Sequence, residues 1–593
     1  MDTTNSPLER VLEIPEIIER ISAYQDRRTF ASATRVSKSW YRAYLPILWH
    51  TIDNGKHWND PGFLKAIVQH GDLIRVLVCA RYDEIDILIP PPKGADALEQ
   101  SVSLCRFLTT VVMPKTASRN QKQQAQFIRQ NPGLRDLSLT FNDQLSSTFT
   151  ELVDAIGDLK HLRRLSFDGN RSLEATTLET ILQRCSSVSP DGNGSLQELS
   201  LSRTSFLRHP FGRGEDFASG VVATRGEDAH WTDTQNSHDT TIPTKEPFAI
   251  TTLRMDKVGC VQDLLLNLCS RFPSLSKLSL SEADELYYSD GFPKRLAQRC
   301  PNIKWLDVSH TEDMDDESMA ELISSFPGLQ TFIAEETRFG TESLNALVEH
   351  CRDLAVLDIT NAYEMDSAAM QRLLNSSWSL RSLNAWGVAY NVIEMMQEAH
   401  REQKRQGGSS TLTDGQPWVC TGLERLILNV IYSPPDDSRV GNVYPPSRAR
   451  RFLYDQLGRL TKLRYLALET SLEDYEDTSD CDGYEDDEDY YGQKKEVRDH
   501  AVEDEDVDSN EVWVDYSFKS GLRRLGSLKE LQQLSLHDVS HNITLAEIRW
   551  MAETWPHLRK IEYLTSAITD QDAQTILEYA AENYPWIQFV EDD

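Results

Sequence analysis

LSKLSL at residues 275–280 is followed by IKWLDV at 303–308, LQTFIA at 329–334, LAVLDI at 354–359 and LRSLNA at 380–385. Each segment has apolar residues at its first, fourth and sixth positions, and successive segments begin 28, 26, 25 and 26 residues apart. Between them, apolar residues recur three or four positions apart, which is the spacing of one helix face. The stretch therefore predicts one strand and one helix in every repeat of about 26 residues.

The same pattern extends in both directions along the chain. Further copies are LRDLSL (134–139), LRRLSF (162–167), LQELSL (196–201), ITTLRM (250–255), LERLIL (423–428), LRYLAL (463–468), LQQLSL (531–536) and LRKIEY (558–563). LIRVLV (73–78) and LTTVVM (108–113) are weaker candidates for earlier strands. The pattern resembles the leucine-rich repeat, which implies an α/β solenoid with a curved parallel sheet and outer helices.

Three segments interrupt the repeats that we assign to residues 131–593. They are residues 206–247, 398–418 and 473–511, and each lengthens the step between strand motifs. The last holds 19 acidic and 3 basic residues, a net charge of −16, which is half of the chain's −32. We expect all three to be flexible loops that leave the solenoid, the last of them acidic. Residues 53–130 are interpreted as a linker with atypical first repeats.

The N-terminal segment 8–52 does not follow the repeat. Three short helices are expected, with Asp26 capping the second and Val36, Trp40 and Tyr44 forming a stripe on the third. The segment resembles the F-box, on the following matches in order: Ile14-Pro15-Glu16, Ile17, Ile18, Ile21, Tyr24, Asp26, Val36-Ser37, Trp40 and Leu48-Trp49. It departs from the family pattern at Ile14, where a leucine is usual, and at Gln25.

The combination resembles fungal F-box proteins with leucine-rich repeats. That likeness implies a substrate-recognition subunit of an SCF-type ubiquitin ligase, in which the F-box docks on a Skp-family adaptor and through it on the cullin scaffold. By the same likeness, the adaptor-binding residues would be Ile14, Pro15, Ile17, Ile18, Ile21, Val36 and Trp40. The alternative is that these apolar side chains only form the core of a three-helix module. A second reading is a scaffold outside any ligase, in which the module only caps the solenoid.

The residues between the repeat's apolar positions predict where a target protein binds. They point away from the core on each strand and form columns on the open face of the sheet. The candidate substrate face consists of Trp305, Asp307, Glu335, Asp358 and Trp386. Aromatic residues dominate interface hot spots, and the carboxylates beside them suggest a target with a basic element.

Other classes of function are disfavoured by the sequence. The net charge of −32 opposes binding to nucleic acid or anionic membranes. No nucleophile, phosphate-loop or metal-ligand pattern is present, so we expect a non-catalytic protein without cofactor or metal. Nine cysteines without CxxC spacing, and no signal peptide or membrane span, suggest a cytoplasmic or nuclear location. Cys300, Cys351 and Cys420 share one repeat position and are expected to pack in the core.

Overall fold

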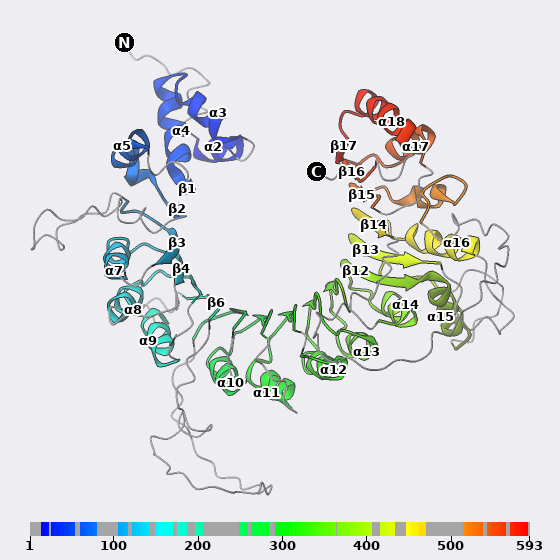
Figure 1. Ribbon diagram of the computed structural model, residues 1–593, viewed down its shortest axis with the longest axis horizontal. Coiled ribbons are helices and arrows are strands. Elements are labelled where there is room, and N and C mark those ends of the chain that lie inside the picture. Colours follow the sequence, from blue (N-terminus) through cyan, green and yellow to red (C-terminus); the bar gives the residue numbers. More distant parts are fainter. Residues whose placement is uncertain are drawn as a thin grey trace, which may run out of the picture. The chain divides into compact units, whose positions relative to one another are not determined.

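The computed structural model divides into two compact units, Met1–Asp307 and Val308–Asp593, which are described separately. The structure describes residues 14–22, 25–53, 60–79, 105–116, 121–141, 149–169, 173, 175–186, 196–204, 248–258, 262–283, 291–311, 313–362, 365–405, 416–432, 446–469, 514–537, 543–564 and 570–590. In each unit taken by itself, the helices of the strand–helix repeats lie on one side of a parallel sheet (Figure 1).

The first unit opens with three helices and continues as strand–helix repeats. The helices are α2 (Pro15–Ser22), α3 (Arg27–Ala33) and α4 (Lys38–His50). The repeats contain β1 (Thr51–Asp53), α5 (Pro61–His70), η1 (Gly71–Leu73), β2 (Val76–Val78), β3 (Thr110–Thr116), α7 (Gln121–Arg129), β4 (Asp136–Phe141), α8 (Phe149–Gly157), β5 (Arg164–Asp168), α9 (Ala175–Ser186), β6 (Glu198–Ser202), β7 (Thr252–Asp256), α10 (Gln262–Ser270), β8 (Lys277–Ser279), α11 (Phe292–Arg299) and β9 (Trp305–Asp307).

The second unit consists of repeats of the same kind. Its elements are α12 (Asp316–Ser324), β10 (Thr331–Ile333), α13 (Thr341–His350), β11 (Val356–Asp358), α14 (Ser367–Ser376), β12 (Ser382–Asn391), α15 (Val392–Arg405), β13 (Arg425–Ile431), α16 (Pro446–Leu457), β14 (Tyr465–Glu469), η5 (Leu522–Ser527), β15 (Gln533–Ser535), α17 (Leu545–Thr554), β16 (Lys560–Glu562), α18 (Asp570–Asn583) and β17 (Gln588–Val590).

Within each unit, consecutive strands pair in parallel with the repeat's fourth positions in register. Leu137 pairs with Leu165 and Leu165 with Leu199 in the first unit. In the second, Leu357 pairs with Leu383 and Leu383 with Leu426. All of these leucines are buried, so each leucine column is a strip of core between the sheet and its helices. The predicted α/β leucine-rich-repeat fold, preceded by a three-helix module, is confirmed.

Each of the thirteen sequence motifs coincides with a strand, and the two weaker candidates are β2 and β3. Sequence analysis missed β1, because Thr51 and Ile52 fall at the end of the N-terminal segment, and β17, which lacks the repeat's leucines. The predicted inserts 206–247 and 473–511 lie outside the described residues. The insert 398–418 overlaps α15, which continues to Arg405. No helix in the described part of the chain is long and apolar enough to span a bilayer.

Candidate functional site

The N-terminal module separates its apolar residues into a core and a surface. Ile18, Phe30, Ala33 and Tyr44 form the buried cluster, and Trp40 packs against it with its ring 5.4 Å from that of Tyr44. The cluster joins all three helices. Of the predicted adaptor-binding residues, Ile18 and Trp40 therefore belong to the core of the module.

Three other predicted adaptor-binding residues lie on the surface of the module. The exposed fractions are 42% for Ile14, 36% for Ile17 and 65% for Val36. Ile21 is half-buried, and Pro15 is the first residue of α2. Because other side chains already fill the core, Ile14, Ile17 and Val36 are not needed there. These apolar side chains are exposed to water, as the residues of a binding interface are when the partner is absent.

Polar caps fix the starts of the second and third helices. Asp26 accepts hydrogen bonds from the backbone nitrogen of Thr29 at 2.8 Å and from its hydroxyl at 2.6 Å. These bonds, that from the hydroxyl above all, hold the pKa of Asp26 below its usual value. Ser37 accepts from the backbone nitrogen of Trp40 at 3.2 Å. The Ser37 cap sets where the turn that carries Val36 ends, and so places Val36 directly before the capping residue of α4.

The open face of the second unit holds a pocket of about 240 Å³. Three of the five residues predicted for the substrate face, Glu335, Asp358 and Trp386, line it. The remaining lining residues are Thr360, Asn384, Ile427 and Glu469. These described residues supply three carboxylates, one indole and no lysine or arginine. The pocket therefore suits a cation, and its indole face would add a cation–π contact.

Asp358 is held in place by three hydrogen bonds. Its Oδ1 accepts from the Thr360 hydroxyl at 2.8 Å and from the Thr360 backbone nitrogen at 3.3 Å. Its Oδ2 accepts from Asn384 Nδ2 at 3.2 Å. These bonds fix the carboxylate in one orientation without neutralising its charge. A cationic ligand would therefore meet a carboxylate whose position is already set.

A β-bulge places Trp386 in the pocket. The pairing of β12 with β13 shifts register between Ala385 and Ala389, and Trp386 lies inside that interval with 40% of its surface exposed. Gly387 follows with φ +87, and a Cβ there would lie 1.9 Å from Asn361 Oδ1. Bulges redirect side chains away from the regular alternation of a strand. The sequence signal was the Trp-Gly pair directly after a repeat motif, and sequence analysis did not use it.

Trp305 and Asp307, the other two predicted residues, lie on β9 in the first unit, and both are half-buried. The Ser279 hydroxyl lies 2.8 Å from Asp256 Oδ1 and 3.2 Å from Asp307 Oδ2. Burial, and to a lesser extent the charge of Asp307, raises the pKa of Asp256. Asp307 is therefore engaged with its own sheet neighbours.

The described residues hold no group of three or more His, Cys, Asp or Glu that could bind a metal ion. Cys300, Cys351 and Cys420 are buried, as expected for packing residues. Burial raises the pKa of the Cys351 and Cys420 thiols to about 12. Such thiols remain protonated at neutral pH and are poor nucleophiles.

No protein-family model matches the sequence. Among solved structures, an internalin from Listeria monocytogenes is similar at 15% identity and a TM-score of 0.33, covering 69% of this chain and 87% of that one. The Rad7 and Elc1 complex in yeast has 14% identity and a TM-score of 0.36, covering 99% and 98%. The TLR13–ssRNA13 complex has 10% identity and a TM-score of 0.31, covering 87% and 65%. Similarity at this level carries no argument about function.

Proposed function

We propose that this chain is a non-catalytic substrate receptor of an SCF-type ubiquitin ligase. Its N-terminal module docks on a Skp-family adaptor, and through it on the cullin scaffold, by the exposed Ile14, Ile17 and Val36. One observation carries the proposal: these three residues, which the F-box resemblance assigns to adaptor binding, are exposed apolar side chains that do not belong to the described buried cluster of the module. Burying them against a partner would remove apolar surface from water, which favours association.

The repeats hold the target protein in this proposal. The pocket at Trp386 takes a lysine or arginine side chain of the target, which Glu335, Asp358 and Glu469 neutralise. An extended sheet face provides a wide binding surface but no chemistry. Ubiquitin transfer is therefore left to other subunits of the ligase.

One observation favours the second candidate, a scaffold capped by the N-terminal module. Arg27 of α3 donates a hydrogen bond to the backbone oxygen of Thr51, and β1, which begins at Thr51 directly after α4, pairs with β2. The module is therefore attached to the first strand of the sheet, as a cap would be. Capping involves the core and this attachment, whereas docking involves the exposed residues. The two candidates can therefore be separated by mutating the surface alone.

The experiment is co-expression of the full chain with a Skp-family adaptor, followed by size-exclusion chromatography. Val36→Asp and Ile17→Asp place a charge on the proposed interface without touching the buried cluster. Val68→Asp on α5 is the matched control, because Val68 is 63% exposed and lies outside the three-helix module. We expect a one-to-one complex with the wild type and the Val68 variant, and its loss with Val36→Asp and Ile17→Asp. No complex with the wild type would overturn the ligase role and leave the capped scaffold.

A further inference from the structure

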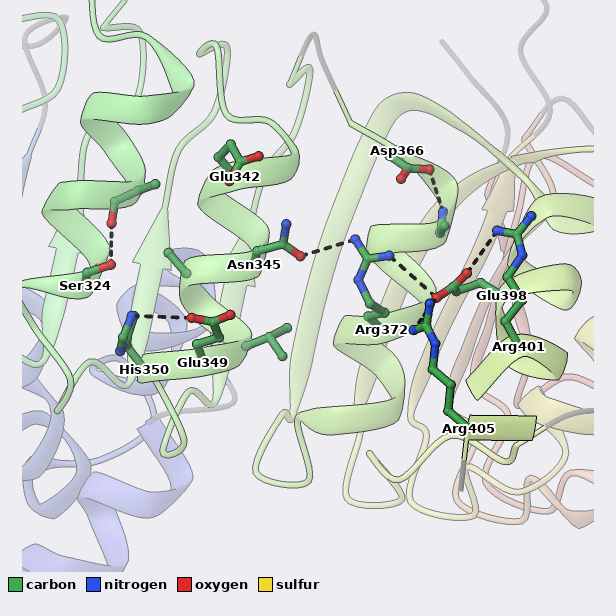
Figure 2. A pocket seen from close by; sticks show the side chains of 14 residues that line it. Ser324, Glu342, Asn345, Glu349, His350, Asp366, Arg372, Glu398, Arg401 and Arg405 are labelled. Carbon is green, nitrogen blue, oxygen red and sulfur yellow. Dashed lines mark hydrogen bonds and ion pairs between the residues drawn. The ribbon is translucent and has the colours of Figure 1, made fainter. Parts of the chain in front are cut away.

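The helical side of the second unit has a pocket of about 790 Å³ that sequence analysis did not anticipate (Figure 2). It lies across four consecutive helices, α12 to α15. Small residues, Ala320, Ser324 and Ala346, line its α12–α13 part. The charged lining residues lie on α13, α14 and α15: Glu342 and Glu349 are on α13, and all of the lining arginines are on α14 and α15.

Three arginines surround one buried carboxylate at the α14–α15 side of the pocket. Glu398 is 3% exposed. Arg401 donates to its Oε2 at 3.1 Å, while Arg405 and Arg372 lie 3.5 Å and 3.7 Å from its Oε1. Arg372 also donates to Asn345 Oδ1 at 3.2 Å. Figure 2 shows the three guanidinium groups converging on Glu398.

This cluster is left with positive charge. Three guanidinium cations against one carboxylate give a net charge of +2. Each guanidinium has five N–H donors, so the three groups together offer far more donors than one carboxylate can accept. The side chains of Arg401 and Arg405 are 60% and 69% exposed, so their donors reach the pocket. A second oxyanion could accept hydrogen bonds from the remaining N–H donors, because guanidinium groups bind carboxylate and phosphate groups in the same bidentate geometry.

The α13 wall of the pocket is acidic. Glu342 and Glu349 stand on α13, and Glu349 is paired with its exposed neighbour His350 at 3.8 Å. Asp366 is engaged differently, since its carboxylate caps α14 by accepting from the Ala368 backbone nitrogen at 2.8 Å. A polyanion such as RNA or a multiply phosphorylated lipid would be repelled by this wall and by the chain's net charge of −32. The pocket favours a ligand with one anionic and one cationic end.

We propose that this pocket binds an extended peptide of a partner protein, with an oxyanion side chain on Arg401 and Arg405 and a basic side chain on Glu342 and Glu349. The acidic helix α13 and the basic helix α15 are two helix spacings apart, about 16–20 Å. An extended chain covers that distance with about five or six residues, at roughly 3.3 Å each. The oxyanion is a carboxylate or a phosphoryl group, which share this chemistry. This proposal is independent of adaptor docking, because it concerns another unit and another face.

The test uses the full chain and fluorescein-labelled Gly/Ser peptides, one with two aspartates at its first end and two lysines at the other, and one in the reverse order. Arg401→Gln with Arg405→Gln removes the charges but keeps amide donors. Arg451→Gln with Arg549→Gln is the matched control, because those side chains are 60% and 64% exposed and belong to ion pairs on α16 and α17. Fluorescence anisotropy measures affinity, and thermal unfolding checks that all variants fold.

We expect the better of the two peptides to bind the wild type and the control variant equally, and the Arg401/Arg405 variant about tenfold more weakly. Replacing both aspartates by asparagine should weaken wild-type binding by a similar factor. It should have no further effect on the Arg401/Arg405 variant, since both changes remove the same contact. Glu342→Gln with Glu349→Gln should reduce the preference for lysine over glutamine.

Two results would overturn the proposal: equal affinity for the aspartate and asparagine peptides, or equal weakening by the control variant. Phosphoserine in place of aspartate identifies the source of the oxyanion. Tighter binding of the phosphopeptide supports the proposal with a phosphorylated partner, and unchanged binding supports it with an acidic one. Loss of binding with phosphoserine would contradict the predicted geometry, because a phosphoryl group offers the arginine forks more oxygens than a carboxylate does.

Discussion

Asp256 favours folding less at neutral pH than in acid, because its carboxylate is half-buried. Burial raises its pKa, so the folded chain holds this proton more tightly than the unfolded chain does. The contribution of this carboxyl to the free energy of unfolding is fully present below its ordinary pKa. It is lost as the pH rises through the pKa that the group has in the folded chain. Asp256→Asn should therefore raise the melting temperature at pH 7, with an advantage that shrinks toward pH 4. Calorimetry across that range checks this, and a lower melting temperature at pH 7 would contradict it.

Asp136 should respond in the opposite direction. Arg164 Nε and Nη2 donate to its two oxygens, each at 2.7 Å, and these bonds hold the pKa of Asp136 below its usual value. The contribution of Asp136 to the free energy of unfolding is then fully present above the pKa that it has in the unfolded chain. It is lost as the pH falls through the pKa that it has in the folded chain. Asp136→Asn should lower the melting temperature at pH 7, with the difference from wild type vanishing in acid. A pH-independent difference would mean that the ion pair is not its cause.

Trp386 should matter for binding more than for stability. With 40% of its surface exposed, Trp386→Ala should cost little of the free energy of unfolding. Loss of a cation–π contact worth about 0.5–2 kcal/mol should weaken binding of a lysine-rich peptide at the pocket by roughly twofold to thirtyfold. Trp378→Ala is the control, because Trp378 is more exposed and does not line the pocket. The measurement is peptide titration beside thermal unfolding, and a large loss of stability would indicate a core role.

Consecutive repeats are joined by side chains as well as by strands, and Asp316 on α12 is the clearest case. It accepts from the backbone nitrogens of Gly340, Glu342 and Ser343 at 2.8–2.9 Å, and so caps the next helix, α13. Asp316→Ala would leave these donors without their acceptor and should cost about 1–2 kcal/mol. Asp313→Ala, at an exposed neighbour, should be close to neutral. Equal effects in chemical denaturation would exclude the cap as the cause.

The sequence was sufficient to predict the helices and strands wherever the apolar pattern of the repeat determines them. Apolar residues at the fourth position predict the strands, because each of them must be buried between the sheet and its helices. The pocket at Trp386 was only partly predictable. Its outward positions followed from alternation, but the bulge beside Gly387 depends on pairing with β13. The arginine cluster shows the same limit. The spacing of Glu398, Arg401 and Arg405 marks one helix face, but Arg372 joins them only through helix packing.

Half of the net charge of the whole molecule lies in residues 473–511. β14 and β15 flank this segment in the sequence and pair directly, with Leu466 opposite Leu534. The pairing of these two strands is therefore made by residues outside the acidic segment. Its removal would halve the net charge from −32 to −16.

Replacing residues 473–511 with a short Gly/Ser linker should leave the chain folded and slightly more stable. A linker of about eight residues shortens the connection between β14 and residue 514 roughly threefold, which lowers the entropic cost of closing it by about 1 kcal/mol. Reduced self-repulsion acts in the same direction, and this part of the gain should disappear at high salt. Thermal unfolding at low and high ionic strength separates the two contributions. A melting temperature several degrees below wild type would mean that the segment packs on the repeats, and the assignment of 473–511 as a loop leaving the solenoid would be wrong.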